Sequence, residues 1–261
     1  MKVDTQIKNK RILLLGSCGS LGEAHTRILA EQGARLIIAD QPGSPVLDKA
    51  KDLGLPGIEI DARNEMQMVT GIAQAGKIHE GLDGSIFNAA ITSESLESSQ
   101  NKFPDFEEYP LRLWQQAIDV NLTGAFLFAR ESGKILKDGG GGSMILVSSV
   151  YGIVGPDHRI YEGQSFRSFP AYSASKAGII GLVRWLSTWW GAHGIRVNSV
   201  CPGGVFNDHQ NGFVKSYSDR VPLGRMASSQ EVTGMLIYLL SDSSSYCTGQ
   251  NLAIDGGLSA W

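Results

Sequence analysis

The feature of this sequence that most constrains its fold is a regular alternation of short apolar runs with segments of helical periodicity. The apolar runs indicate buried parallel strands, at residues 11–15, 35–39, 57–60, 84–87, 143–147, 196–200 and 252–254. Two of the intervening segments stand out as long helices, at about 111–134 and 171–192. Because strands and helices alternate from the amino terminus onward, we expect an α/β fold in which helices cover both faces of a doubly wound parallel sheet.

The composition favours one domain that binds small molecules. The chain has 261 residues, 42% of them hydrophobic, so we expect a single domain over residues 1–261. A net charge of −3, without a block of Lys and Arg, argues against nucleic acid or an anionic membrane as partner. No stretch approaches the ~20 apolar residues of a membrane helix, and the amino terminus lacks an apolar signal core, so we expect a soluble, unprocessed protein.

The cysteines and histidines argue against a disulfide framework and against a metal site. Cys18, Cys201 and Cys247 lie far apart and form no CxxC pair, which fits a reducing cytoplasm. The five histidines share no metal-ligand spacing. We therefore predict a cytoplasmic protein without a bound metal.

A glycine-rich turn joins the first predicted strand to the first helix. Gly16, Gly19 and Gly22 lie between the apolar run at 11–15 and a helical pattern that opens at Glu23. In this order of elements, backbone N–H groups and the positive end of the helix can meet a pyrophosphate, which favours a Rossmann-type dinucleotide site. The alternative is that the glycines only allow a tight turn.

Carboxylates follow the second and third strands. Asp40 lies about 20 residues beyond the glycine turn, where Rossmann proteins place a carboxylate on the adenosine ribose hydroxyls. That carboxylate repels a 2′-phosphate, and neither the turn nor Gln41 supplies a cation to neutralise one, so NAD is favoured over NADP. Asp40 could instead only solvate the strand end. Asp61 could contact the adenine or cap the helix expected near Asn64.

A candidate catalytic group lies farther along the chain. Tyr172 and Lys176 are four residues apart near the start of a predicted helix, so their side chains share one face. An ammonium there stabilises the phenolate and lowers the tyrosine pKa from its ordinary ~10 toward neutrality. Ser149, just after a strand, is placed to hydrogen-bond a substrate oxygen. Asn121, inside the helix expected at 111–134, could hold a water that relays protons to the lysine.

Taken together, these segments resemble the short, single-domain branch of the short-chain dehydrogenase/reductase family over nearly the whole chain. The likeness rests on the TGxxxGIG turn at 16–22, the NNAG segment at 88–90, Asn121, the Ser149, Tyr172 and Lys176 group, the Pro202-Gly203 pair, and the SD, TG and DGG tail at 241–257. It implies cofactor contacts from Gly16, Ser20, Leu21, Gly22, Asp40, Asp61, Ala62, Asn88, Ala89, Tyr172, Lys176, Pro202, Gly203 and Val205. Leu15, Ser20, Ala90 and Asn207 depart from the family pattern, so the phosphate and carboxamide contacts can be rearranged.

Between the catalytic serine and tyrosine the chain carries an inserted stretch, at about 156–168, that is longer than is common in the family. Since both of its ends adjoin catalytic residues, we expect this inserted loop on the substrate side, with Tyr151, Arg159 and Arg167 as candidate substrate contacts. The alternative is a structural loop or a subunit contact. The stretch resembles dehydrogenases of bacterial surface-glycan and flagellin-modification loci, which implies a polar, sugar-like substrate.

The sequence thus predicts an oxidoreductase that moves a hydride between NAD and an alcohol or carbonyl substrate. Two alternatives stay open: an enzyme like the 3-oxoacyl carrier-protein reductases, and a catalytically silent dinucleotide sensor. The family resemblance also implies a homotetramer in which two long helices pair between subunits.

Overall fold

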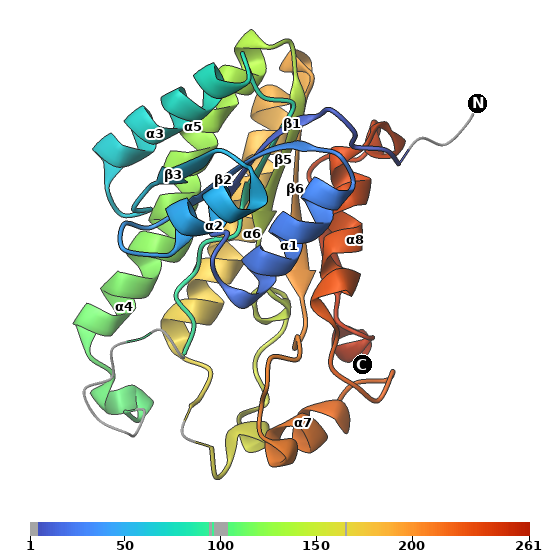
Figure 1. The fold of residues 1–261 in the computed structure, drawn as a ribbon. Coiled ribbons are helices and arrows are strands. Elements are labelled where there is room, and N and C mark those ends of the chain that lie inside the picture. Colours follow the sequence, from blue (N-terminus) through green and yellow to red (C-terminus); the bar gives the residue numbers. More distant parts are fainter. Residues whose placement is uncertain (1–4, 94–95, 97–103, 165) are drawn as a thin grey trace.

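The computed structural model describes residues 5–93, 96, 104–164 and 166–261. In these residues a seven-stranded sheet has the order β3-β2-β1-β4-β5-β6-β7, and all neighbouring strands are parallel (Figure 1). The strands are β1 (Arg11–Leu15), β2 (Arg35–Asp40), β3 (Gly57–Glu59), β4 (Gly84–Phe87), β5 (Gly142–Val147), β6 (Ile195–Pro202) and β7 (Asn251–Ile254). Each lies on one of the predicted apolar runs, so the doubly wound α/β fold class is confirmed.

Helices connect the strands and pack against the sheet. They are α1 (Ser20–Glu31), α2 (Val46–Leu53), α3 (Glu65–Ile78), α4 (Leu111–Ile118), α5 (Gly124–Asp138), α6 (Pro170–Trp190), α7 (Asn211–Ser218) and α8 (Ser229–Leu240). The helix predicted at 171–192 is confirmed as α6. The helix predicted at 111–134 is interrupted by a π-helical turn, Asp119–Thr123. The turn widens the helix without ending it, and no helix-breaking residue within the turn marks it in the sequence. No helix of the described residues is both long and apolar enough to span a membrane.

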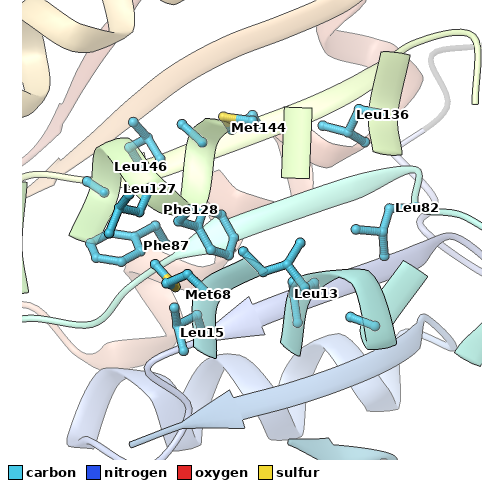
Figure 2. Close-up of a cluster of buried hydrophobic side chains, with 14 of the residues drawn as sticks. Leu13, Leu15, Met68, Leu82, Phe87, Leu127, Phe128, Leu136, Met144 and Leu146 are labelled. Carbon is cyan, nitrogen blue, oxygen red and sulfur yellow. The ribbon is translucent and has the colours of Figure 1, made fainter. Parts of the chain in front are cut away.

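The sheet separates two apolar layers. Successive strand residues point to opposite faces, so Leu13 joins the layer beneath α3, α5 and α6, whereas Leu14 joins the layer beneath α1, α2 and α8 (Figure 1). In the first layer Phe87 of β4 packs on Phe128 of α5, with ring centroids 5.5 Å apart (Figure 2). Both layers are fully buried, which holds the strands and their carboxyl ends in fixed positions.

The strand order reverses between β1 and β4. β1 pairs with β2 on one side and with β4 on the other, and the chain continues outward from each of them in opposite directions. The loops after β1 and β4 therefore diverge and leave a crevice at the carboxyl edge of the sheet, which is where doubly wound proteins bind their ligands.

A buried histidine joins α1 to α8. His25 is fully buried, and its Nδ1 lies 2.8 Å from Thr233 Oγ1. Because Thr233 donates its own hydroxyl proton to the Ser229 carbonyl, the histidine must donate from Nδ1 and carry no proton on Nε2. Burial lowers the pKa of His25 to about 4, so the ring is neutral at physiological pH.

Candidate active site

A cleft of about 880 Å³ lies at the carboxyl edge of the sheet, at the reversal of strand order. It is lined by loops that follow β1, β2, β3, β4, β5 and β6 and by the start of α6. Of the cofactor contacts predicted from the sequence, those lining it are Gly16, Ser20, Leu21, Asp40, Asp61, Ala62, Asn88, Ala89, Tyr172, Lys176, Pro202, Gly203 and Val205. The fold therefore gathers in one cavity residues that are up to about 190 positions apart in the chain.

Two glycines of the turn, Gly16 and Gly22, stand where no side chain fits. Gly16 has φ +90°, and a Cβ there would lie 2.3 Å from the Ala89 backbone nitrogen. Gly22 does not line the cleft. A Cβ on Gly22 would lie 2.1 Å from the Gly16 carbonyl oxygen, so the absence of a side chain lets α1 pack closely against the turn. The Asn88 amide donates to that same carbonyl at 2.8 Å and fixes the turn to the end of β4.

The start of α1 faces the cleft without a side-chain cap. Its N-cap is Gly19, which makes no side-chain hydrogen bond, and the first helical residues, Ser20 and Leu21, line the cavity. First-turn N–H groups have no partner inside a helix, and they carry the positive end of its dipole. This geometry suits a pyrophosphate, as the sequence predicted.

Asp40 lies where β2 ends. One carboxylate oxygen accepts the Cys18 N–H of the glycine turn at 2.7 Å, and the other accepts the Gln41 N–H at 2.8 Å. A carboxylate has about four lone-pair sites, so both oxygens keep acceptor capacity toward the cleft. Asp40 therefore orders the glycine turn as well as placing a carboxylate in the wall of the cleft.

The structure separates the two roles that the sequence left open for Asp61. The side chain of Asn64, not that of Asp61, caps α3 by accepting the Gln67 N–H at 3.1 Å. Asp61 instead lines the cleft and accepts two hydrogen bonds, at 3.0 and 2.9 Å, from the guanidinium of Arg63. Hydrogen bonds from Arg63 lower the pKa of Asp61, which keeps this carboxylate charged.

The candidate catalytic side chains meet at the inner end of the cleft. Ser149 follows β5, while Tyr172 and Lys176 rise from the first turns of α6 and share the face that the spacing predicted. Lys176 is 2% exposed; its ammonium donates to the Val147 carbonyl at 2.9 Å and lies 5.6 Å from the centroid of the Tyr172 ring. Burial lowers the pKa of Lys176 to about 8.

Asn121 lies inside the π-helical turn and is fully buried. Its Oδ1 accepts the Ile91 N–H at 2.7 Å, and its Nδ2 donates to the Ile91 carbonyl and to Ser175 Oγ, each at 3.2 Å. These contacts tie the loop after β4 to α6 beside the catalytic group. The hydrogen bonds of Asn121 run to Ile91 and Ser175 rather than to Lys176, so the predicted water relay stays a prediction.

A second pocket, of about 160 Å³, adjoins the cleft. The two cavities share Ser149 and Tyr172, so the candidate catalytic group stands at their junction. The wall of this pocket is rich in aromatic and sulfur-containing side chains, which are Tyr151, Tyr161, Phe166, Phe169, His209, Phe213, Tyr217 and Met226. Those from α7 and the segments beside it went unpredicted, because they match no motif and only tertiary packing brings them to the site.

The inserted loop is divided between this pocket and the surface; its position 165 lies outside the described residues. Tyr161 and Arg167 line the pocket, and Arg167 lies 3.4 Å from Asp105. Arg159 does not line the pocket, contrary to the role predicted for it. Its side chain is 72% exposed and pairs at 2.8 Å with Asp157, whose charge is also compensated by a neighbouring arginine.

Comparison with known proteins places the chain in a family. A family model described as enoyl-(acyl carrier protein) reductase matches residues 16–259. The trans-4-hydroxycyclohexanecarboxylate dehydrogenase of Sinomonas cyclohexanicum is 32% identical, over 99% of this chain and 96% of the relative. The 3-alpha-(or 20-beta)-hydroxysteroid dehydrogenase of Mycobacterium tuberculosis H37Rv is 32% identical, over 95% and 88%.

A solved structure gives the same result. The short chain dehydrogenase from Leptospira borgpetersenii, crystallised with bound NAD+, is 30% identical and superposes with a TM-score of 0.85 over 97% of this chain and 94% of that one. The sequence motifs, the sheet order and these relatives agree, and the chain belongs to the short-chain dehydrogenase/reductase family.

Proposed function

We propose that this protein is a NAD-dependent dehydrogenase that interconverts a secondary alcohol and its ketone. The observation that carries the proposal is the position of Ser149 and Tyr172, which line both the nucleotide-sized cleft and the small aromatic pocket. A substrate oxygen in the pocket can reach both hydroxyls while the reacting carbon faces the cleft. This arrangement also favours an enzyme over a catalytically silent dinucleotide sensor.

The cleft fits a nicotinamide dinucleotide. The glycine positions that exclude any Cβ, the uncapped start of α1 and the Asp40 carboxylate supply the phosphate and ribose ends of the site. Pro202, Gly203 and Val205 supply the other end, next to the catalytic group. When bound, the nicotinamide ring provides the acceptor or donor of the hydride.

The proton is handled by the protein's own side chains. The Tyr172 hydroxyl exchanges a proton with the substrate oxygen, and Ser149 donates a hydrogen bond that polarises the same oxygen. With a pKa of about 8, the Lys176 ammonium is mostly protonated at neutral pH, and its charge near the Tyr172 ring stabilises the phenolate. The Val147 carbonyl holds the ammonium in this position.

The pocket favours a substrate with an apolar body. Its largely aromatic lining suits an apolar body better than the sugar-like molecule that the sequence predicted, because sugar hydroxyls that face the aromatic rings would lose water without regaining a hydrogen bond. A cavity of about 150 Å³ is known to hold a benzene ring, so this pocket is suited to about one ring. The relative named for trans-4-hydroxycyclohexanecarboxylate agrees with a one-ring body of this kind.

The family model's description keeps a carrier-protein thioester as the second candidate substrate. Reduction of the 3-keto group of a 3-oxoacyl carrier-protein thioester with either cofactor, faster than oxidation of any cyclic alcohol, would select that alternative.

We also infer a homotetramer and a cytoplasmic location. Trp185 and Trp189 on α6 are 57% and 63% exposed and stack on each other at 5.3 Å, and Phe126 on α5 is 47% exposed. Exposed aromatic groups on these two helices support pairing of the same helices between subunits. Sedimentation analysis tests the oligomeric state, and the location continues to rest on the cysteine pattern.

Tyr172→Phe tests the proposed function. It removes the transferable proton with little change in volume, so kcat with a cyclic alcohol and NAD should fall at least ~10²-fold while NADH binding persists. Near-native kcat in this variant would contradict the assignment. Lys176→Ala should lower both kcat and cofactor affinity.

A further inference from the structure

Two tyrosine hydroxyls meet in the wall of the aromatic pocket. Tyr151 lies two residues beyond the catalytic serine, and Tyr161 is the last residue of a short 3-10 helix, His158–Tyr161, in the inserted loop. Their hydroxyl oxygens are 2.9 Å apart, and both residues line the pocket. Through this contact the inserted loop meets the segment that follows Ser149.

The ring of Tyr161 is held firmly. It is 8% exposed, stands edge-on to Phe166 with centroids 5.8 Å apart, and packs on Phe213 of α7 at 5.6 Å. Such packing sets the direction of its hydroxyl before any substrate arrives. The Tyr217 hydroxyl accepts the Gly204 N–H and holds the loop beside the cleft.

The Tyr151–Tyr161 pair keeps one O–H group that can donate to a further partner. Burial raises the pKa of Tyr161 to about 12 and raises that of Tyr151 as well, so both hydroxyls are protonated at neutral pH. The pair holds two protons, and the hydrogen bond between its oxygens uses one of them. Among the described residues, the two hydroxyls form a hydrogen bond with each other and with no further group, so one O–H is left to donate.

The apolar surroundings of the pair make this remaining O–H donor important for substrate binding. The pair belongs to an apolar cluster that includes Phe166, Phe213 and Met226. A substrate oxygen entering this part of the pocket would lose water to an apolar wall, which is costly unless a hydrogen bond replaces it. The pair supplies that hydrogen bond at a fixed place in this wall, and so favours substrates that carry an oxygen there.

We propose that the Tyr151–Tyr161 hydroxyl pair is a second recognition point, which donates a hydrogen bond to an oxygen of the substrate other than the reacting one. The inference rests on the proposed function and narrows its substrate class to secondary alcohols on an apolar body of about one ring that bear a second hydroxyl, keto or carboxylate oxygen. The catalytic tyrosine and serine take the reacting oxygen, and the pair takes the second.

The experiment compares ring compounds that differ only in the second oxygen. Initial rates with NAD are measured for cyclohexanol, cyclohexane-1,4-diol and trans-4-hydroxycyclohexanecarboxylate, on wild type, Tyr151→Phe and Tyr161→Phe. The ratio of kcat/KM between each oxygen-bearing ring and cyclohexanol should fall about fivefold or more in both variants, since one hydrogen bond is lost. Tyr109→Phe removes a buried hydroxyl outside the pocket and should leave the ratio as in wild type.

Binding provides a readout that needs no turnover. Calorimetry on the NADH-bound enzyme should show weaker affinity for cyclohexane-1,4-diol in Tyr161→Phe than in wild type and Tyr109→Phe. Equal affinities, or equal kcat/KM ratios in all variants, would overturn the inference, and so would a wild type that binds neither oxygen-bearing ring. A wild type that binds these rings but oxidises none contradicts the proposed function alone.

Discussion

Replacing Asp40 tests the basis of cofactor choice most directly. Its carboxylate is fixed at the rim of the cleft by the N–H groups of Cys18 and Gln41, so the negative charge cannot turn away from an approaching 2′-phosphate. Two unit charges 4 Å apart repel by ~1 kcal/mol in water and ~4 kcal/mol at an effective dielectric constant of 20. Asp40 is partly exposed, so the lower part of that range applies, about 1.4 kcal/mol or tenfold in cofactor preference.

The variant Asp40→Ala/Gln41→Arg removes the repulsion and adds a cation. The NADP to NAD ratio of kcat/KM should therefore rise tenfold or more, measured on one substrate with both cofactors. Asp40→Asn is the matched control: it removes the charge, adds no cation and should give a smaller rise. A wild type that prefers NADP, or a double variant with an unchanged ratio, would refute the reasoning.

The loss of hydrogen bonds in the same variants is measured separately. In Asp40→Ala/Gln41→Arg the Cys18 N–H of the glycine turn loses its acceptor, so kcat/KM for NAD should fall along with the melting temperature, whereas the amide oxygen in Asp40→Asn can still accept from Cys18. Melting curves for the single and double variants separate this structural cost from the change in cofactor preference.

Three further predictions follow from the geometry. Gly16→Ala places a Cβ against backbone at φ +90° and should destabilise the protein by at least ~2 kcal/mol in urea unfolding, whereas Gly19→Ala meets no atom within 4 Å and should be nearly neutral. Arg167→Ala should raise KM for a carboxylate-bearing substrate several-fold, whereas Arg159→Ala, remote from the pocket, should leave steady-state kinetics as in wild type; the reverse order would contradict the pocket assignment. The pKa of His25 falls from 6.5 to about 4 on folding, so the unfolded chain binds the proton first as pH drops, and the free energy of unfolding should decrease between pH 6.5 and 4, by at most about 3 kcal/mol. His25→Gln should flatten this pH dependence, and an unchanged slope would exclude the histidine as its source.

The cofactor cleft was predictable because its residues follow strands. Once apolar runs identify parallel strands, the residues after Leu15, Ala39 and Val147 must meet at one edge of the sheet, whatever the loops between them do. Local spacing was enough for Tyr172 and Lys176, which share one helix face. Neither inference needs knowledge of how distant segments pack.

Local patterns failed where two residues could serve the same purpose or where a helix changed its pitch. Asp61 and Asn64 both precede a helix and both can cap it, and only the backbone geometry selects Asn64. The π-helical turn around Asn121 is equally invisible, because its residues continue an apolar pattern that a regular α-helix would also produce.

The inserted loop shows why composition alone did not predict which of its residues line the pocket. Its charged residues suggested a polar binding surface, but burying an unpaired charge is costly, so such side chains tend to remain in water with a partner, as Arg159 and Asp157 do. Burial of the aromatic residues of the loop stabilises the folded state, and Tyr161 turns inward onto Phe213 of α7, a helix that lies some 50 positions later in the chain. In a loop over a catalytic group, the apolar residues are therefore the ones that shape the pocket. A hydroxyl carried inward on an aromatic ring can still provide polar recognition, and for this reason substitution of Tyr161, unlike that of Arg159, should change substrate choice.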